Sequence, residues 1–205
     1  MDQFLVVALA HFLALLIPGV DFFLIVRTSA AHGWRSASGT CLGIALANGV
    51  FIAAAFSGLA LVDSQNVLAW IELAGGLFLV YMGIVFWRAR VSLAGKGDGA
   101  VGRSTWLKNL GLGTASGLLN PKNALFYVSL AATLSSASPA LLALYGVWMF
   151  SIVLAWDLFV AVAMGSRRPR ALLARVLPGI IKVAGIVVML FGIGALAAAV
   201  GTLMR

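Results

Sequence analysis

The chain has 205 residues, of which 62% are hydrophobic and only 10% are charged. Soluble domains carry about 45 to 50% apolar and about 25% charged residues, so this composition excludes a soluble globular domain and indicates a protein that is solvated by lipid. The net charge of +8 would suggest nucleic acid in a soluble protein, but here the cations lie at the ends of apolar runs, so membrane topology explains them and no nucleic-acid partner is expected.

Long apolar runs predict an all-α integral membrane protein with about six transmembrane helices, because each crossing needs about 20 apolar residues. The first run has no basic segment or cleavage pattern ahead of it, so we expect it to be the first span and not a removable signal peptide. We expect residues 1–205 to form a single transmembrane domain. The predicted spans are residues 4–26, 40–62, 67–87, 107–134, 140–165 and 179–204.

The first span contains Pro18-Gly19 in its interior, followed by Asp21. Proline removes an amide donor and clashes with the preceding turn, so the pattern predicts a helix break. An ordinary proline kink is the alternative, since membrane helices tolerate proline and glycine. A charge at bilayer depth costs at least about 2.5 kcal/mol, so we expect Asp21 to face a cavity or another charge.

The connections after the first, third and fifth predicted spans carry the cations. Twelve of the fourteen Lys and Arg residues lie on or beside residues 27–39, 88–106 and 166–178. Since cytoplasmic loops of membrane proteins are enriched in Lys and Arg, we expect these connections in the cytoplasm and both termini in the periplasm of a bacterial inner membrane.

The second and fifth spans each carry one polar residue in an otherwise apolar run, Asn48 and Asp157. A buried carboxylate without a charged partner favours its protonated form, so Asp157 is a candidate for proton coupling. An interfacial position or a hydrogen-bonded neutral acid is the alternative for Asp157, and interhelical hydrogen bonding is the alternative for Asn48. Small residues at every fourth position, in Gly39-x-x-x-Gly43-x-x-x-Ala47 and Gly113-x-x-x-Gly117, predict close packing of the second and fourth spans.

The fourth span contains Asn120-Pro121-Lys122-Asn123 in its interior. Asn120 is a suitable N-cap and Pro121 a suitable first residue for a new helix, so we predict a second break here. The positive end of that half-helix, with Lys122 beside it, would hold an anion. An ion pair between Asp21 and Lys122 is the alternative interpretation.

The two halves of the chain resemble each other around these breaks. Leu15-Leu16-Ile17-Pro18 with Phe22-Phe23-Leu24 is echoed by Leu118-Leu119-Asn120-Pro121 with Leu125-Phe126-Tyr127. Because three spans per half is an odd number, the halves, about 1–95 and 105–205, are predicted to form inverted repeats of the kind found in secondary transporters.

Four segments resemble the LysE/RhtB family of bacterial amino-acid exporters: Pro18-Gly19-Val20-Asp21-Phe22-Phe23, His32-Gly33-Trp34-Arg35, Gly43-Ile44-Ala45-Leu46-Ala47 and Gly117-Leu118-Leu119-Asn120-Pro121-Lys122. The resemblance implies a compact six-span carrier that exports amino acids or their derivatives, driven by the proton gradient. The chain departs from the family pattern at Val20, where a second proline is usual. It also lacks the usual Pro-Gln-Phe in the stretch after Ser129.

We therefore expect an exporter with no cofactor and no metal, whose partners are an amino-acid substrate, protons and lipid; a homodimer stays open. Asp21 is expected to meet the substrate ammonium while Lys122 and the half-helix hold the carboxylate. The candidate substrate-binding residues are Pro18, Gly19, Asp21, Asn48, Asn120, Pro121, Lys122 and Asn123, and the candidate proton-coupling residues are Asp157 and Asp21.

Three other functions are weighed against this one. An intramembrane enzyme would need a nucleophile beside a base, yet His11 and His32 are the only histidines and Cys41 has neither at a recognisable spacing. A channel would favour rings of like charge, which the sequence does not repeat. A metal-ion exporter would need clustered carboxylate, His or Cys ligands, which two isolated aspartates match poorly.

Overall fold

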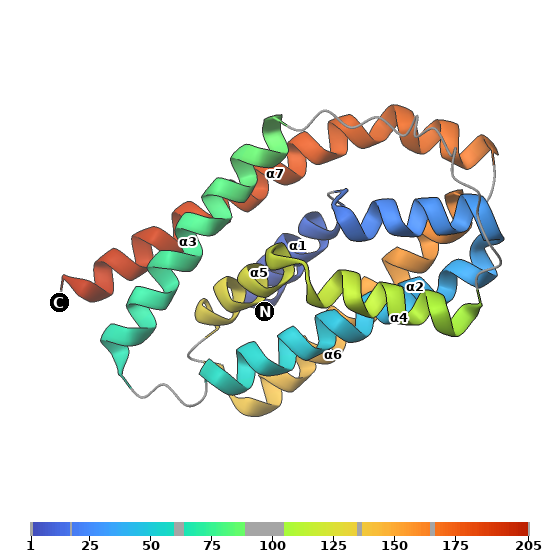
Figure 1. Ribbon diagram of the computed structural model, residues 1–205. Coiled ribbons are helices and arrows are strands. Elements are labelled where there is room, and N and C mark those ends of the chain that lie inside the picture. The colour runs from blue at the N-terminus through green and yellow to red at the C-terminus, as the bar shows by residue number, and fades with distance from the viewer. Residues whose placement is uncertain are drawn as a thin grey trace.

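The computed structural model describes residues 2–16, 18–59, 64–88, 105–134, 137–164 and 167–204. These residues form seven α-helices and no strand (Figure 1), so the predicted all-α class is confirmed. Four segments are long and apolar enough to cross a membrane, and a shorter apolar helix precedes them. The helices are α1 (Asp2–Leu15), α2 (Val20–Leu59), α3 (Gln65–Arg88), α4 (Trp106–Leu118), α5 (Pro121–Ala132), α6 (Pro139–Met164) and α7 (Arg167–Leu203).

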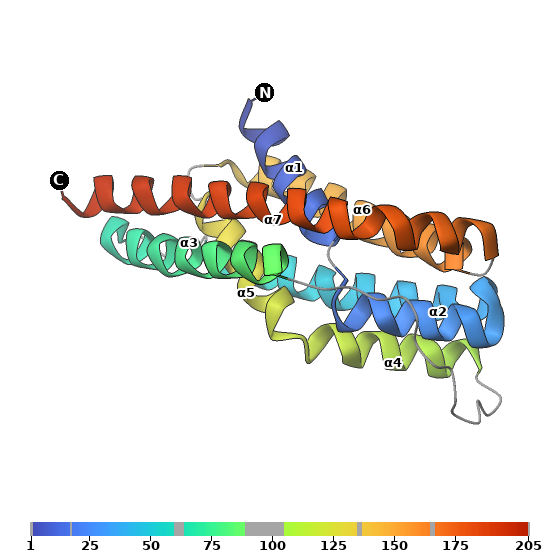
Figure 2. The ribbon, with the colours of Figure 1, turned by 90° about the horizontal axis from the view of Figure 1, so that it is seen from above.

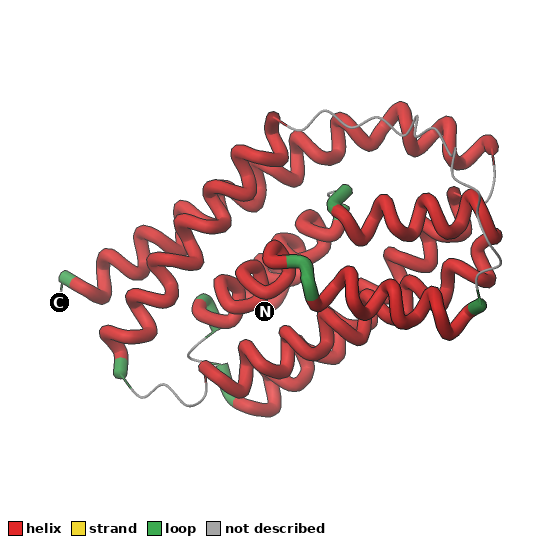
Figure 3. Tube along the Cα trace, in the orientation of Figure 1, coloured by secondary structure: helices red, strands yellow, loops and turns green. Residues whose placement is uncertain are grey.

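Both predicted helix breaks are confirmed. The first lies between the end of α1 at Leu15 and the start of α2 at Val20, and the second between Leu118 and Pro121. Figure 3 shows the two interruptions as short loop segments near the middle of the helix bundle. The second break follows the local chemistry closely, since Asn120 is in an extended conformation, with φ −85° and ψ 103°, and caps α5.

Two predicted connections are wrong in extent. Residues 27–39 are helical, and α2 is interrupted only at Gly33, whose φ of 79° and ψ of 162° suit glycine because it has no Cβ. Figure 1 shows that α2 turns back on itself along its length. The predicted loop 166–178 is also largely helix, because α7 begins at Arg167 and passes through Pro178. Arginine and leucine, which fill this stretch, are good helix formers.

Other parts of the predicted boundaries lie outside the described residues. These are the ends of the second and fifth spans, at residues 62 and 165, and most of the connection 88–106. The apolar segment Pro178–Leu203 agrees closely with the predicted last span.

Helices α2 and α4 pack backbone to backbone, as the small-residue motifs predict. A Cβ at Gly43 would overlap the carbonyl oxygen of Leu110, and one at Gly113 would overlap that of Thr40. Helices α3 and α7 also lie side by side in both views (Figures 1 and 2), where a Cβ at Gly83 would lie 2.6 Å from the carbonyl oxygen of Gly185. Glycine therefore allows close backbone contact in two helix pairs, α2 with α4 and α3 with α7.

Candidate functional site

The two helix breaks meet in the interior through the side chain of Lys122. Lys122 lies in the first turn of α5, and its ammonium group approaches the break between α1 and α2. A Cβ built on Gly19 would lie 3.5 Å from Lys122 Nζ, so glycine leaves room for this approach. Two of the candidate binding residues, Gly19 and Lys122, therefore lie close together, and Lys122 places a cation between two helix ends.

Asp21, in the first turn of α2, connects this break to α4 and α5. Its Oδ1 accepts a hydrogen bond of 2.6 Å from Ser116 Oγ. Its Oδ2 accepts two hydrogen bonds of 3.0 Å, from Asn120 Nδ2 and Asn123 Nδ2. Three donors without charge thus hold the carboxylate.

The alternative ion pair between Asp21 and Lys122 is absent from the part of the chain that the structure describes. Short side chains explain this difference, because the amides of Asn120 and Asn123 already reach Asp21 Oδ2. The longer lysine side chain passes instead toward Gly19. Sequence spacing alone does not distinguish these two arrangements.

Asn120 serves both breaks at once. Its Oδ1 accepts a hydrogen bond of 3.1 Å from the Lys122 backbone N–H, while its Nδ2 donates to Asp21. The Asn123 backbone N–H donates to the Asn120 carbonyl, and Pro121 has no N–H to offer. The first amides of α5 are therefore largely satisfied within the chain, and the carboxylate beside this helix end is that of Asp21. The ammonium of Lys122 is the cation at the break, and no described residue forms an ion pair with it.

A small cavity of about 30 Å³ lies beside Lys122. This volume suits about one or two water-sized groups, so in this conformation the cavity is too small for a whole amino acid. Asn48, Lys122 and Asn123 are the predicted site residues that line it. The complete lining is His11, Ala14, Leu15, Asn48, Met82, Lys122, Asn123, Phe126, Tyr127 and Val188.

Asp157 and Asn48 are both buried, as their positions in apolar helices predict. Asp157 is 8% exposed, and its Oδ2 has no hydrogen-bond partner within the described residues. Asp157 lies in α6 and is not among the residues that line the cavity beside Lys122. Asn48 Nδ2 donates to the Ile44 carbonyl of its own helix at 2.8 Å, so the interhelical hydrogen bond considered for it is not formed by this group.

Sequence reasoning did not single out Ser116, Tyr127 or His11 as site residues. Tyr127 and His11 lie 116 positions apart in the sequence, and a hydrogen bond joins their side chains. No local sequence pattern indicates this contact. Ser116 offers one retrospective signal, because it lies four residues before Asn120 and so precedes the break by about one turn.

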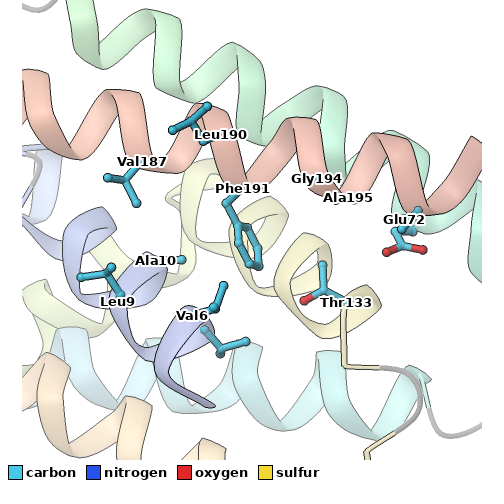
Figure 4. A pocket seen from close by; sticks show the side chains of 12 residues that line it. Val6, Leu9, Ala10, Glu72, Thr133, Val187, Leu190, Phe191, Gly194 and Ala195 are labelled. Carbon is cyan, nitrogen blue, oxygen red and sulfur yellow. The ribbon is translucent and has the colours of Figure 1, made fainter. Parts of the chain in front are cut away.

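A larger apolar groove of about 610 Å³ lies among α1, α3, α5 and α7, away from the paired breaks. Figure 4 shows Phe191 of α7 pointing toward α1 and α5. Glu72 and Thr133 are its polar lining residues. None of the predicted site residues lines this groove.

Comparison with known proteins adds independent observations. The family described as LysE type translocator matches residues 12–198. The threonine efflux protein of Escherichia coli is 30% identical over 168 residues, which cover 77% of this chain and 80% of that protein. The uncharacterized membrane protein YahN of the same species is 26% identical over 182 residues, or 86% of this chain and 81% of that protein. No solved structure matches the chain.

Proposed function

Because this chain belongs to the LysE type translocator family, we propose that it exports amino acids or amino-acid derivatives across the bacterial cytoplasmic membrane by proton antiport. The observation that carries the proposal is the position of Lys122, whose ammonium lies between two broken helices. Broken helices at the bilayer midplane are the usual binding elements of secondary transporters. Threonine is the first substrate to test, because a similar protein is a threonine efflux protein.

The proposed architecture has six spans in two inverted repeats. Counted this way, α1 with α2 up to Gly33 is one broken span, and α4 with α5 is its counterpart in the second half. The remainder of α2, then α3, α6 and α7 supply the other four. The matching positions of the breaks support the repeat, and the clustered cations support cytoplasmic placement of the turn at Gly33 and periplasmic termini.

Lys122 is proposed to bind the substrate carboxylate. A lysine ammonium offers three donors and no acceptor, and no ion pair within the described residues occupies it. The cavity beside it is small, so the helices are proposed to separate before a whole amino acid enters. An amine that matches the substrate but lacks its carboxylate is expected to bind roughly tenfold or more weakly, since hydrogen bonds to charged groups contribute about 1.5 to 3 kcal/mol.

Asp21 is proposed to meet the substrate ammonium. A carboxylate has about four acceptor positions, and three hydrogen bonds from Ser116, Asn120 and Asn123 occupy three of them. The donors hold the group in an orientation that leaves room for one further donor. Asp21 also accepts hydrogen bonds from residues on both sides of the second break. Substrate binding at Asp21 would therefore affect both α4 and α5.

Asp157 is proposed to bind the proton that is exchanged for the exported amino acid. Asp157 is buried, and among the described residues none is hydrogen-bonded to its Oδ2. The charged form therefore has a large desolvation cost, which proton uptake removes. Asp157→Asn would mimic a permanently protonated carrier. The variant is expected to exchange labelled threonine across vesicles at equilibrium but to lose uphill export.

Vesicle transport tests the proposal as a whole. Inside-out vesicles that contain the native protein should accumulate labelled threonine when their lumen is acidic, and the accumulation should collapse when the pH gradient is dissipated. A channel would equilibrate the amino acid in both conditions and would never concentrate it. Failure of all amino acids to move, with protein correctly inserted, would contradict export.

A further inference from the structure

His11 is a buried polar side chain that the proposed transport steps leave without a role. It lies in α1 and is 0% exposed. Its Nε2 lies 3.2 Å from the hydroxyl oxygen of Tyr127, and its Nδ1 has no hydrogen-bond partner within the described residues. Buried polar atoms are nearly always hydrogen-bonded, so the unpaired Nδ1 can take a partner that the described residues do not supply.

The same cavity that lies beside Lys122 is lined by His11 and Tyr127. Asn48 and Asn123 add two further polar side chains, and the rest of the lining is apolar. A ligand bound at Lys122 could therefore extend a small group toward His11. The volume of about 30 Å³ suits a group of about one or two heavy atoms, which is the size of a hydroxyl group.

The surroundings of His11 favour a neutral imidazole. Its ring is packed against Phe126, Tyr127 and Trp148, at centroid distances of 6.0, 5.8 and 5.6 Å. An apolar aromatic enclosure opposes a buried charge, and the cation of Lys122 on the same cavity opposes a second positive charge. Asp21 and Asp157 interact electrostatically with Tyr127, but no carboxylate within the described residues is hydrogen-bonded to His11. His11 therefore acts as a neutral hydrogen-bonding side chain and not as a second cation beside Lys122.

We propose that His11 Nδ1, held in place by Tyr127, is a subsite for a hydroxyl group on the side chain of a small amino acid. The inference rests on the proposed function, with the substrate carboxylate at Lys122. A neutral imidazole has one donor and one acceptor nitrogen, so Nδ1 is a donor if Nε2 accepts from Tyr127 and an acceptor if Nε2 donates. A hydroxyl satisfies either case, because it both donates and accepts.

Threonine and valine provide the test, because they have nearly the same shape and differ by a hydroxyl in place of a methyl group. In binding and counterflow measurements on the full-length protein, the native chain should prefer threonine by roughly tenfold, the scale of one hydrogen bond. His11→Phe keeps an aromatic ring against Phe126 and Trp148 but has no ring nitrogen, so the threonine-to-valine ratio should fall to about one. His11→Gln retains a donor and an acceptor and should keep part of the preference.

Trp148→Phe is the matched control, because Trp148 contacts the His11 ring without lining the cavity. Trp148→Phe should keep the native threonine-to-valine ratio, because it alters a ring contact of His11 but leaves both ring nitrogens of His11 in place. A native ratio in His11→Phe, or a native protein that prefers valine, would overturn the subsite while leaving export intact. A native protein that moves no amino acid would contradict the proposed function and this inference with it.

Discussion

Replacement of Asp21 separates its structural role from its proposed role in substrate binding. Two of its three donors, Asn120 and Asn123, are buried, with exposed fractions of 9% and 7%. Asn123 Nδ2 also donates to the Gly117 carbonyl at 3.4 Å, so Asp21→Ala removes the acceptor on which the Asn120 amide depends. A buried donor left without a partner costs about 1 to 3 kcal/mol, so Asp21→Ala is expected to reduce the free energy of unfolding by about 1 to 3 kcal/mol. The third donor, Ser116, is only partly buried, and water can replace its partner.

Asp21→Asn removes the charge but preserves the hydrogen-bond pattern. Its amide oxygen can accept from Asn120 and Asn123, and its NH₂ group can donate to Ser116 Oγ, which accepts as readily as it donates. We expect a loss below about 2 kcal/mol, because weaker bonds are offset by the lower cost of burying a neutral group. Export should nevertheless be lost, since the substrate ammonium needs the carboxylate.

The assay combines unfolding of the detergent-solubilised variants with transport in vesicles. Equal unfolding midpoints for Asp21→Ala and Asp21→Asn would refute the structural reasoning, because the hydrogen bonds are what distinguishes the two variants. Native export by a stable Asp21→Asn protein would show that Asp21 acts only through packing of the two breaks.

Three further predictions concern packing, backbone and topology. Gly113→Leu should prevent the close approach of α2 and α4 and abolish stable protein, whereas Gly111→Ala, with nothing within 4 Å of the added Cβ, should be tolerated; solubilised yield and thermal stability compare them. Gly33→Ala should lower the free energy of unfolding by about 1 to 3 kcal/mol, from backbone strain alone. An unchanged free energy of unfolding would mean that residue 33 can adopt a negative φ in the folded protein. In a Cys41→Ala background, an impermeant thiol reagent applied to intact cells should label Ser64→Cys and not Ala31→Cys, and the reverse pattern would invert the proposed orientation.

The sequence predicts those features of the fold that depend on local chemistry. Pro18 and the pair Asn120-Pro121 mark the helix breaks because proline restricts the backbone and asparagine caps a new helix. The extent of the connections is mispredicted for a related reason. Charged residues such as those in 167–175 are read as loops, although arginine-rich segments continue helices readily.

The site is predicted less completely, because its contacts join distant parts of the chain. The sequence suggests an approach of Asp21 and Lys122, but Lys122 approaches Gly19, and Asp21 pairs with amides that the charge-based argument did not consider. His11 looks unremarkable in an apolar helix. Only the structure shows that it meets Tyr127 and reaches the cavity beside Lys122.

Equilibrium binding of labelled threonine to purified Lys122→Met and Lys182→Met tests the central claim most directly. Both substitutions remove one cation, but Lys182 is exposed and lies over Trp87 at 5.8 Å, on another helix from the breaks. We predict native affinity for Lys182→Met and an affinity about 10 to 100 times lower for Lys122→Met, the scale of a lost hydrogen bond to a charged group. Native affinity in a folded Lys122→Met protein would contradict the assignment of the paired helix breaks as the amino-acid site.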